Sequence, residues 1–179
     1  MAAWIAAILL AVPTALALRT AGWQQSDLLP LSARERIVIW NITARTTLEH
    51  PLTGIGANAS GAATRRSASS ADTELAAMGR AKFTHPHNAY LQVWYELGLP
   101  GALLLLFFGL AVLREIGRLA PSVRAYALGQ FSITAILLAS SYGLWQHWLL
   151  SAVALGVMAL MLATVVQRPA LPEQNAKEK

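Results

Sequence analysis

Apolar residues occur along the chain in four long blocks, separated by segments that are polar or rich in turn-forming residues. The blocks cover residues 2–18, 97–113, 125–144 and 148–166. Each is close to the ~20 residues that an α-helix needs to cross the hydrocarbon core of a bilayer. The pattern predicts an all-α, polytopic membrane protein with three or four transmembrane helices. Residues 1–18 form either the first of these or a signal-like segment, because Ala15-Leu16-Ala17 resembles a cleavage site but no basic region precedes the apolar block.

The composition agrees with a membrane protein and limits the chemistry. Hydrophobic residues make up 55% of the chain and charged residues 13%, and the mean hydropathy of +0.46 is too high for an ordinary soluble domain. The absence of cysteine excludes disulfides and thiolate metal ligands. His85 and His87 are spaced i, i+2, which is not a helical ligand pair, and no compact third ligand follows. We therefore expect no metal and no cofactor.

The basic residues of the short connections predict the orientation in the membrane. They cluster between the second and third apolar blocks and after the last one: Arg114, Arg118, Arg124, Arg168, Lys177 and Lys179. By the positive-inside rule both places are cytoplasmic, so residues 97–166 supply three transmembrane helices, residues 167–179 a cytoplasmic tail and residues 19–96 a long external loop. That loop contains eight of the fourteen Lys and Arg residues, and loops longer than ~60 residues translocate largely regardless of charge. Its positive charge suits anionic ligands such as phosphates, and nucleic acid is not an expected partner on that side.

The external loop contains a predicted amphipathic helix. Ser32 and Glu35 fit a capping box, and Pro51 ends the helical pattern. The apolar positions between them repeat at helical spacing: Ile37, Trp40, Ala44 and Leu48. We expect this helix to lie on the membrane surface or on the helix bundle. Gly54 and Gly56 then predict a tight turn.

The stretch "HPHNAYLQVWYELGLPG" places ionisable groups directly before the second apolar block. It predicts a helix that begins near His85 or Pro86 and breaks at Gly98 and Pro100. Such a helix has four residues on one face: His87, Tyr90, Leu91 and Trp94. Glu96 falls about 180° from the first of them. Because a carboxylate at a membrane boundary is costly unless it is paired, we expect Glu96 to pair with an arginine of another element.

The stretch "SYGLWQHWLL" connects the last two apolar blocks on the same external side. Tyr142, Trp145 and Trp148 are typical of an aromatic belt at a membrane interface. His147 lies among them, which favours an interfacial role over a catalytic one.

Three motifs follow one another along the external loop. The first is Arg36 with Trp40, and the second is the Pro-Leu-x-Gly-x-Gly turn of residues 51–56. The third is the His-Asn-x-Tyr-Leu-Gln element of residues 87–92, followed by Glu-x-Gly at 96–98. Together they resemble the O-antigen ligase/O-antigen polymerase family of bacterial envelope enzymes. The resemblance implies a multi-pass glycosyltransferase of the bacterial inner membrane. Such enzymes transfer a glycan from an undecaprenyl-diphosphate carrier to a hydroxyl acceptor, such as lipid A-core, on the periplasmic face.

The resemblance also implies roles for individual residues. His87 would be the base that deprotonates the acceptor, because a histidine titrates near neutral pH; the alternative is a helix cap or a headgroup contact. Arg36 would stabilise the departing diphosphate, and the alternative is a solvated helix residue. Asn88 either binds a sugar or phosphate oxygen or caps the helix. Tyr90 and Glu96 are further candidate substrate-binding residues.

Three more basic residues are candidates for binding the anionic substrate. Arg65 and Arg66 lie in residues 57–73, a small and polar segment typical of a linker or a lid. They either close over the substrate or form a solvated pair. Arg80 precedes the histidines and either faces a phosphate or anchors a lipid headgroup.

Two other functions remain open from the sequence. The first is an O-antigen or exopolysaccharide polymerase, which uses the same donor with a growing glycan as acceptor. The second is a catalytically incomplete membrane subunit that binds lipid-linked glycan. Family members have more spans than this chain, so the resemblance covers a C-terminal part. Three interpretations stay open: a fragment, the product of a truncated gene, or one half of a split protein, for which a partner chain would supply the further helices.

Overall fold

The computed structural model describes residues 1–66, 83–140 and 143–166, and every element in these ranges is helical. The elements are α1 (Ala2–Leu9), α2 (Ala11–Thr20), the 3-10 helix η1 (Trp23–Gln25), α3 (Leu31–Glu49), α4 (Ser60–Arg66), α6 (Ala89–Arg118), α7 (Pro121–Ser140) and α8 (His147–Val166). The prediction of an all-α membrane protein is confirmed.

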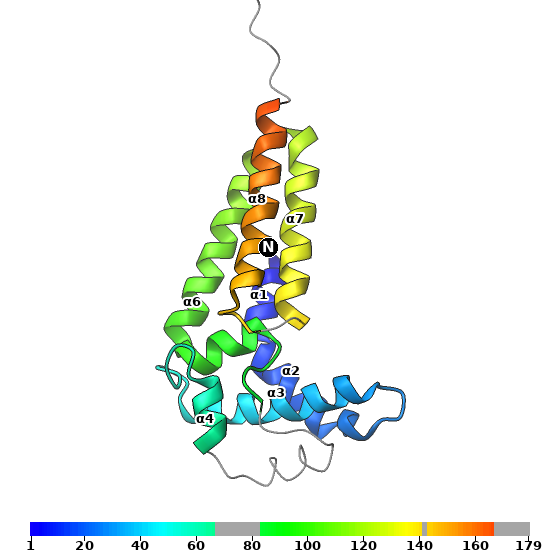
Figure 1. The fold of residues 1–179 in the computed structure, drawn as a ribbon, viewed down its shortest axis with the longest axis vertical. Helices are drawn as coiled ribbons and strands as arrows, with labels where there is room; N and C mark the ends of the chain where they lie inside the picture. The colour runs from blue at the N-terminus through cyan, green and yellow to red at the C-terminus, as the bar shows by residue number, and fades with distance from the viewer. Residues whose placement is uncertain (67–82, 141–142, 167–179) are drawn as a thin grey trace, which may run out of the picture.

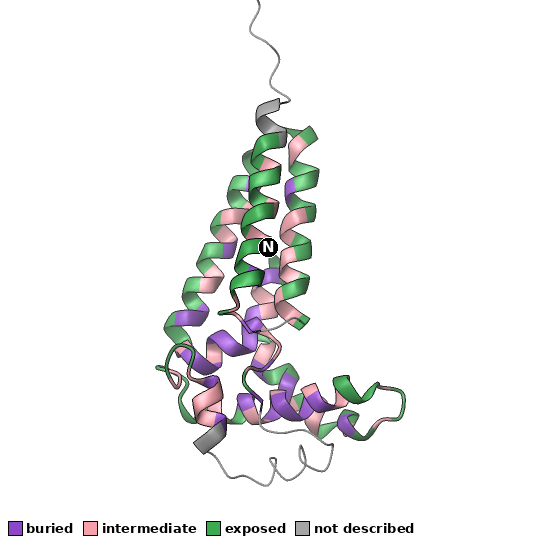
Figure 2. Ribbon diagram, in the orientation of Figure 1, coloured by how far each residue is buried: buried purple, intermediate pink, exposed green. Residues whose placement is uncertain are grey.

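The helices form two parts that meet at one end of the molecule (Figure 1). Helices α6, α7 and α8 run side by side as a long bundle, and α1 packs against α6. Helix α3 lies across the end of this bundle, where it packs against α2 and α6. Buried residues concentrate at the junction, whereas the outer faces of the bundle are exposed (Figure 2).

Two of the described helices are long and apolar enough to cross a membrane, namely α6 and α7. Helices α1 and α2 meet at Leu10 with a bend of 59°, so the predicted first span is a broken helix; counted together, this pair would be a third span. In α8 the apolar stretch described with its side chains is His147–Leu162. The predicted number of three or four transmembrane helices stays a prediction.

Helix α3 confirms the predicted helix before Pro51 but not its predicted start. The helix begins at Leu31 with Pro30 as N-cap, and no side chain caps it. Ser32 therefore stands inside the first turn, and Glu35 is buried, so the predicted capping box is wrong. The fixed φ of proline, −62° here, favours a helix start at the following residue. Because α3 packs against α2 and α6, it lies on the bundle.

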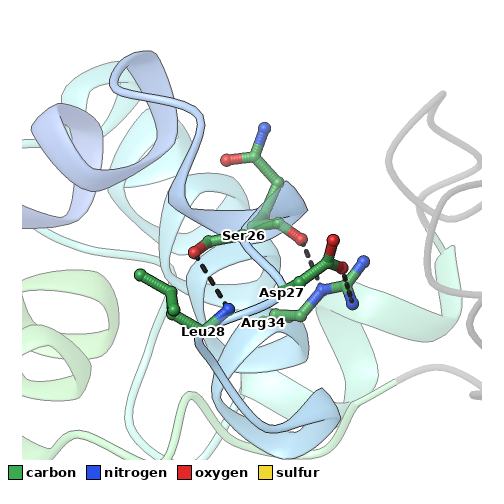
Figure 3. Close-up of polar contacts among 5 residues, drawn as sticks. Ser26, Asp27, Leu28 and Arg34 are labelled. Carbon is green, nitrogen blue, oxygen red and sulfur yellow. Dashed lines mark hydrogen bonds and ion pairs between the residues drawn. The ribbon is translucent and has the colours of Figure 1, made fainter.

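Arg34 ties the start of α3 to the connection that precedes it (Figure 3). Its Nε donates to the carbonyl oxygen of Gln24 at 2.9 Å, and its Nη1 lies 3.9 Å from the carboxylate of Asp27. Within the same connection, the Leu28 N–H donates to the hydroxyl of Ser26. These contacts fix the direction in which α3 leaves the α2 end.

Indole N–H groups hold helices together by donating to main-chain carbonyls. Trp94 of α6 donates to the carbonyl of Ile8 at 2.8 Å, beside the break between α1 and α2. Trp4 of α1 donates to the carbonyl of Leu106 at 3.2 Å, and its ring packs edge-on against Tyr90. In an apolar environment an indole N–H would be costly to leave without an acceptor. These contacts therefore fix α1 against α6.

Candidate functional site

The turn that follows α3 contacts the break in α6. Gly98 has φ +62°, which confirms the predicted break. Pro100 has no N–H to donate to the carbonyl of Glu96 in the helix, and the Gly56 N–H donates to that carbonyl at 2.9 Å instead. The Ile55 N–H likewise donates to the carbonyl of Tyr95 at 3.0 Å. The turn thus supplies the hydrogen bonds that the break removes.

Glycine is required on both sides of this contact. A Cβ on Gly54 would lie 2.4 Å from the carbonyl carbon of Glu96, and one on Gly98 would lie 2.7 Å from the amide nitrogen of Gly54. Both glycines also have positive φ, a conformation that side chains disfavour. The two backbones therefore touch directly, and the predicted tight turn at Gly54 and Gly56 is confirmed.

The carboxylate of Glu96 lies at the centre of a buried polar cluster. The side chain is 1% exposed. One oxygen accepts from the Asn58 N–H at 2.8 Å and from the indole of Trp145, and the other accepts from the hydroxyl of Ser60 and from Gln92 Nε2 at 3.0 Å. We expected an arginine partner, but among the described residues these hydrogen-bond donors are all neutral. Several donors can satisfy a buried carboxylate in place of one counter-charge.

Gln92 extends this cluster to the α7–α8 connection at the same end of the bundle. It lies one turn before Glu96 on α6 and is also buried. Its Oε1 accepts from the Leu144 N–H at 2.8 Å. Together with the bond from Trp145 to Glu96, this contact fixes the described part of the α7–α8 connection, residues 143–146, against α6.

The histidine segment stands before α6 and outside it. The helix begins at Ala89 with Asn88 as N-cap, whose Oδ1 accepts from the Leu91 N–H at 3.1 Å. The predicted start at His85 or Pro86 is therefore wrong, and His87 does not share a helical face with Tyr90. His87 has φ +55°, a left-handed conformation that costs about 1–2 kcal/mol for a residue with a side chain. Asn88 favours a helix start at Ala89, because its side-chain oxygen accepts from the Leu91 N–H, which has no acceptor within the first turn.

The two histidines of this segment form a contacting pair. Their ring centroids are 4.3 Å apart and their planes are inclined by 71°. His85 packs against the α7–α8 connection, since a Cβ on Gly143 would lie 3.0 Å from its Cγ. Burial lowers the pKa of His85, and its own backbone and the negative charge of Glu96 oppose this effect.

Helix α3 places its Arg–Trp motif at this segment. The indole of Trp40 donates to the carbonyl of Pro86 at 2.7 Å, directly before His87. Arg36, one turn earlier on α3, donates from Nη1 to the carbonyl of Ser140 at the end of α7, at 3.0 Å. The motif therefore connects α3 to both the histidine segment and the end of α7. Arg45 is exposed and bonds Asn41 of its own helix, as expected for a surface residue.

Other candidate residues have structural partners or fall outside the described part. Tyr90 is buried and its hydroxyl donates to the carbonyl of Ala135 at 2.8 Å, which joins α6 to α7. Asn88 caps α6, as described above. The side chains of Arg65 and Arg66 and all of Arg80 lie outside the described residues. Trp145 and Trp148 are partly exposed near the end of the bundle and His147 is exposed, whereas Tyr142 of the predicted belt is outside the described residues.

Sequence reasoning missed the residues that build the polar cluster. These are Asn58, Ser60, Gln92 and Trp145. The sequence could have indicated Gln92, because it lies four residues before Glu96 and therefore on the same face of a helix. The others are separated from Glu96 by 36 to 49 positions along the chain, and no local pattern marks them.

The apolar helices, with buried polar side chains gathered at one end of the bundle, define a multi-pass membrane protein. The family model described as O-Antigen ligase matches residues 1–106, more than half of the chain. The chain belongs to this family. The matched region includes α3, the turn, the histidine segment and the break in α6, whereas the α7–α8 connection lies beyond it.

Curated relatives agree with this family. A protein of Rickettsia conorii named "Putative polysaccharide ligase RC0486" is 29% identical over 149 residues, which is 80% of this chain and 34% of that protein. A protein of Rickettsia bellii with the name "Putative polysaccharide ligase" is 31% identical over 143 residues, which is 77% of this chain and 33% of that protein. The chain thus spans about a third of the length of these relatives. No solved structure matches it.

Proposed function

We propose that this chain takes part in transferring a glycan from an undecaprenyl-diphosphate carrier to a hydroxyl acceptor, of the lipid A-core type, at the periplasmic face of the bacterial inner membrane. The observation that carries the proposal is the convergence of the family's motifs. Trp40 bonds the carbonyl next to His87, and Arg36, one turn away on the same helix, bonds the end of α7. A candidate base and a candidate phosphate ligand thus belong to connected elements at one end of the apolar helices.

His87 is the proposed base. The acceptor hydroxyl attacks the anomeric carbon, the bond from that carbon to the carrier diphosphate breaks, and the hydroxyl proton passes to the imidazole. A neutral imidazole suits this step because it titrates near neutral pH. The strained backbone at His87 agrees with a functional role, since such conformations concentrate at active sites.

Arg36 is the proposed ligand for the departing diphosphate. One Nη1 donor reaches the carbonyl of Ser140, and the planar guanidinium has further N–H groups suited to phosphate oxygens. Its charge would stabilise the negative charge that develops on the carrier as the glycan leaves. Because the curated relatives are about three times as long, we propose that additional helices, on the same chain or a partner chain, complete the groove for the polyprenyl carrier.

Reconstitution tests the proposal. The chain is placed in proteoliposomes with a polyprenyl-diphosphate glycan and a lipid A-core acceptor. One set of proteoliposomes contains the chain alone. A second set also contains a full-length relative, which supplies the additional helices and whose own histidine segment is inactivated. We expect His87→Ala to lower the transfer rate by about 100-fold or more, and Arg36→Ala to lower it by a similar factor. Arg45→Ala is the matched control on the exposed face of the same helix.

The product also identifies the reaction. Glycan attached to lipid A-core supports the ligase reaction, whereas elongation of the carrier-bound glycan would replace it with a polymerase reaction. Unchanged transfer by both variants, with protein amounts in the membrane equal to those of the unsubstituted chain, would show that His87 and Arg36 do not act in the reaction.

A further inference from the structure

Three side chains form a chain of polar contacts that leads from the start of α8 to the proposed base. The indole Nε1 of Trp148 lies 2.5 Å from Gln146 Oε1. Gln146 Nε2 lies 3.4 Å from His85 Nε2. The ring of His85 then contacts that of His87, with 4.3 Å between the centroids. None of these residues except His87 belongs to the catalytic pair proposed above.

The donor and acceptor types determine which way each contact runs. An indole N–H only donates, so the atom of Gln146 that faces Trp148 must be the amide oxygen. The amide nitrogen of Gln146 therefore faces His85, and this nitrogen also only donates. His85 Nε2 must then be the acceptor, which means that it carries no proton. A neutral imidazole with an unprotonated Nε2 carries its proton on Nδ1.

The surroundings of His85 keep it in this state. Gly143 lies close to the ring, since an added Cβ would come within 3.2 Å of His85 Cδ2. Within residues 143–146, the described part of the α7–α8 connection, Gly143 and Gln146 lie near the ring, and neither has a titratable side chain. On α6, the negative charge of Glu96 raises the pKa of His85. On α3, Trp40 donates to the carbonyl of Pro86, the residue after His85, and Arg36 lies one turn before Trp40. Burial is the largest effect, and it lowers the pKa of His85.

We propose that Trp148 and Gln146 hold His85 as the neutral Nδ1–H tautomer, and that this assigns the proton taken up during glycan transfer to His87. Two imidazolium rings at this separation would repel each other, so one member of the pair takes the proton readily and the second does not. An Nε2 that accepts from an amide N–H is the less favourable site. His85, Gln146 and Trp148 are thus positioning residues, and their role in the reaction rests on the proposed function of His87.

Nitrogen NMR of the full chain in detergent micelles tests the tautomer without any assay of transfer. The chain has four histidines, and single His→Gln variants assign the ¹⁵N signals of the imidazoles. We expect His85 to show a protonated Nδ1 and an unprotonated Nε2 at pH of about 7, and His87 to take up a proton before His85 as the pH falls. A protonated Nε2 on His85 at that pH, or uptake by His85 before His87, would overturn the proposal.

Two substitutions at Gln146 separate this role from a purely structural one. Gln146→Glu replaces the donor by an acceptor, so we expect the pKa of His85 to rise and that of His87 to fall by about one unit or more. The acid limb of the transfer rate should move to lower pH by a similar amount. Gln146→Leu removes the donor without adding charge and should leave a mixture of His85 tautomers. If neither variant changes the His85 signals, the contact with Gln146 does not set the tautomer.

The two readouts also separate the inference from the proposed function. If the His85 signals behave as expected but His87→Ala keeps full transfer activity, the catalytic role of the pair is wrong and the tautomer assignment stands. If His87→Ala abolishes transfer but Gln146→Glu moves neither the NMR titration nor the pH profile, the positioning role of Gln146 is wrong.

Discussion

The part of α6 before Gly98 and the part after it lie in different surroundings. Before the break, Gln92 and Glu96 are buried, and both bond the α7–α8 connection. After the break, most of α6 is exposed or half-exposed (Figure 2). Its large apolar side chains include Leu104 at 71% exposure and Phe108 at 66%. In lipid, apolar side chains gain little by packing against one another, because the acyl chains are equally apolar. The relative positions of the helices are therefore specified mainly by the polar end.

Helices α7 and α8 show the same contrast. In α7 only Ala127 is buried among the described side chains, and Leu149 lies buried at the start of α8 near the polar end. Where the two helices do touch along the bundle, a small residue permits it, since a Cβ on Gly156 would overlap the side chain of Gln130. The long helices thus depend on the polar end for their arrangement, and substitutions there should have much larger effects than substitutions along the spans.

The largest effect is expected from removing the carboxylate at the centre of the polar cluster. Glu96→Leu leaves several buried donors without an acceptor, at about 1–3 kcal/mol for each that stays unsatisfied. We expect the free energy of unfolding in detergent to fall by roughly 3–5 kcal/mol. Leu155→Ala on the exposed face of α8 is the control from the spans, with an expected change below about 0.5 kcal/mol. Equal effects of the two substitutions would contradict the contrast between the two parts.

A smaller but still large effect is expected at the contact between the turn and the break. Gly54→Ala adds a methyl group against the backbone of Glu96 and places alanine at positive φ. We expect a loss of about 2–4 kcal/mol, measured by denaturant or thermal unfolding. Gly129→Ala in α7 is the matched control, because nothing lies within 4 Å of its added Cβ, and it should leave stability unchanged or raise it by up to about 1 kcal/mol. A similar loss in both variants would show that the close backbone contact is not needed.

The cap of α6 should contribute less. Asn88→Ala removes the acceptor of the Leu91 N–H, so we expect a loss of about 1 kcal/mol. Asn88→Asp keeps an acceptor at the same place and should retain most of the stability. If the alanine and aspartate variants lost equal stability, the side chain of Asn88 would have another role, such as the substrate contact that the sequence left open.

The smallest effect is expected from the titration of His85. Its pKa in the folded protein lies below the ordinary value of 6.5, so below that pH the unfolded chain binds more protons than the folded one. Stability is then fully present above about pH 6.5 and decreases as the pH falls toward the folded pKa. The melting temperature of His85→Gln should depend less on pH between about 5 and 7 than that of the unsubstituted chain. An unaltered pH profile of His85→Gln would mean that burial does not destabilise the charged form.

Local chemistry made parts of the fold predictable from the sequence. The helix before Pro51, the tight turn at Gly54 and the break at Gly98 all follow from proline and glycine, whose backbone preferences act within a few residues. The start of α6 was harder, because both His85-Pro86 and Asn88 are acceptable starts and the choice depends on the left-handed backbone at His87. The capping box at Ser32 failed for a related reason, since Pro30 offers a start two residues earlier.

The candidate site was predictable only in part because its contacts join distant segments. The motifs located His87 and Arg36, but the spacing of residues did not indicate that the partners of Glu96 are neutral groups at residues 58, 60, 92 and 145. A predicted ion pair was the reasonable expectation for a carboxylate at a membrane boundary. A set of neutral donors replaces it because the turn and the α7–α8 connection both deliver N–H groups to the same buried position.

The bonds from Leu144 and Trp145 to α6 bear on how this family exchanges segments during evolution or in protein engineering. A recombination point in the short connection between α6 and α7 would combine Gln92 and Glu96 of one parent with a different α7–α8 hairpin from the other. Such a hybrid would bury a carboxylate and an amide opposite groups selected for another neighbour. We therefore expect α6 and the α7–α8 hairpin to pack correctly only when both come from the same parent, although the family model ends inside α6 at residue 106.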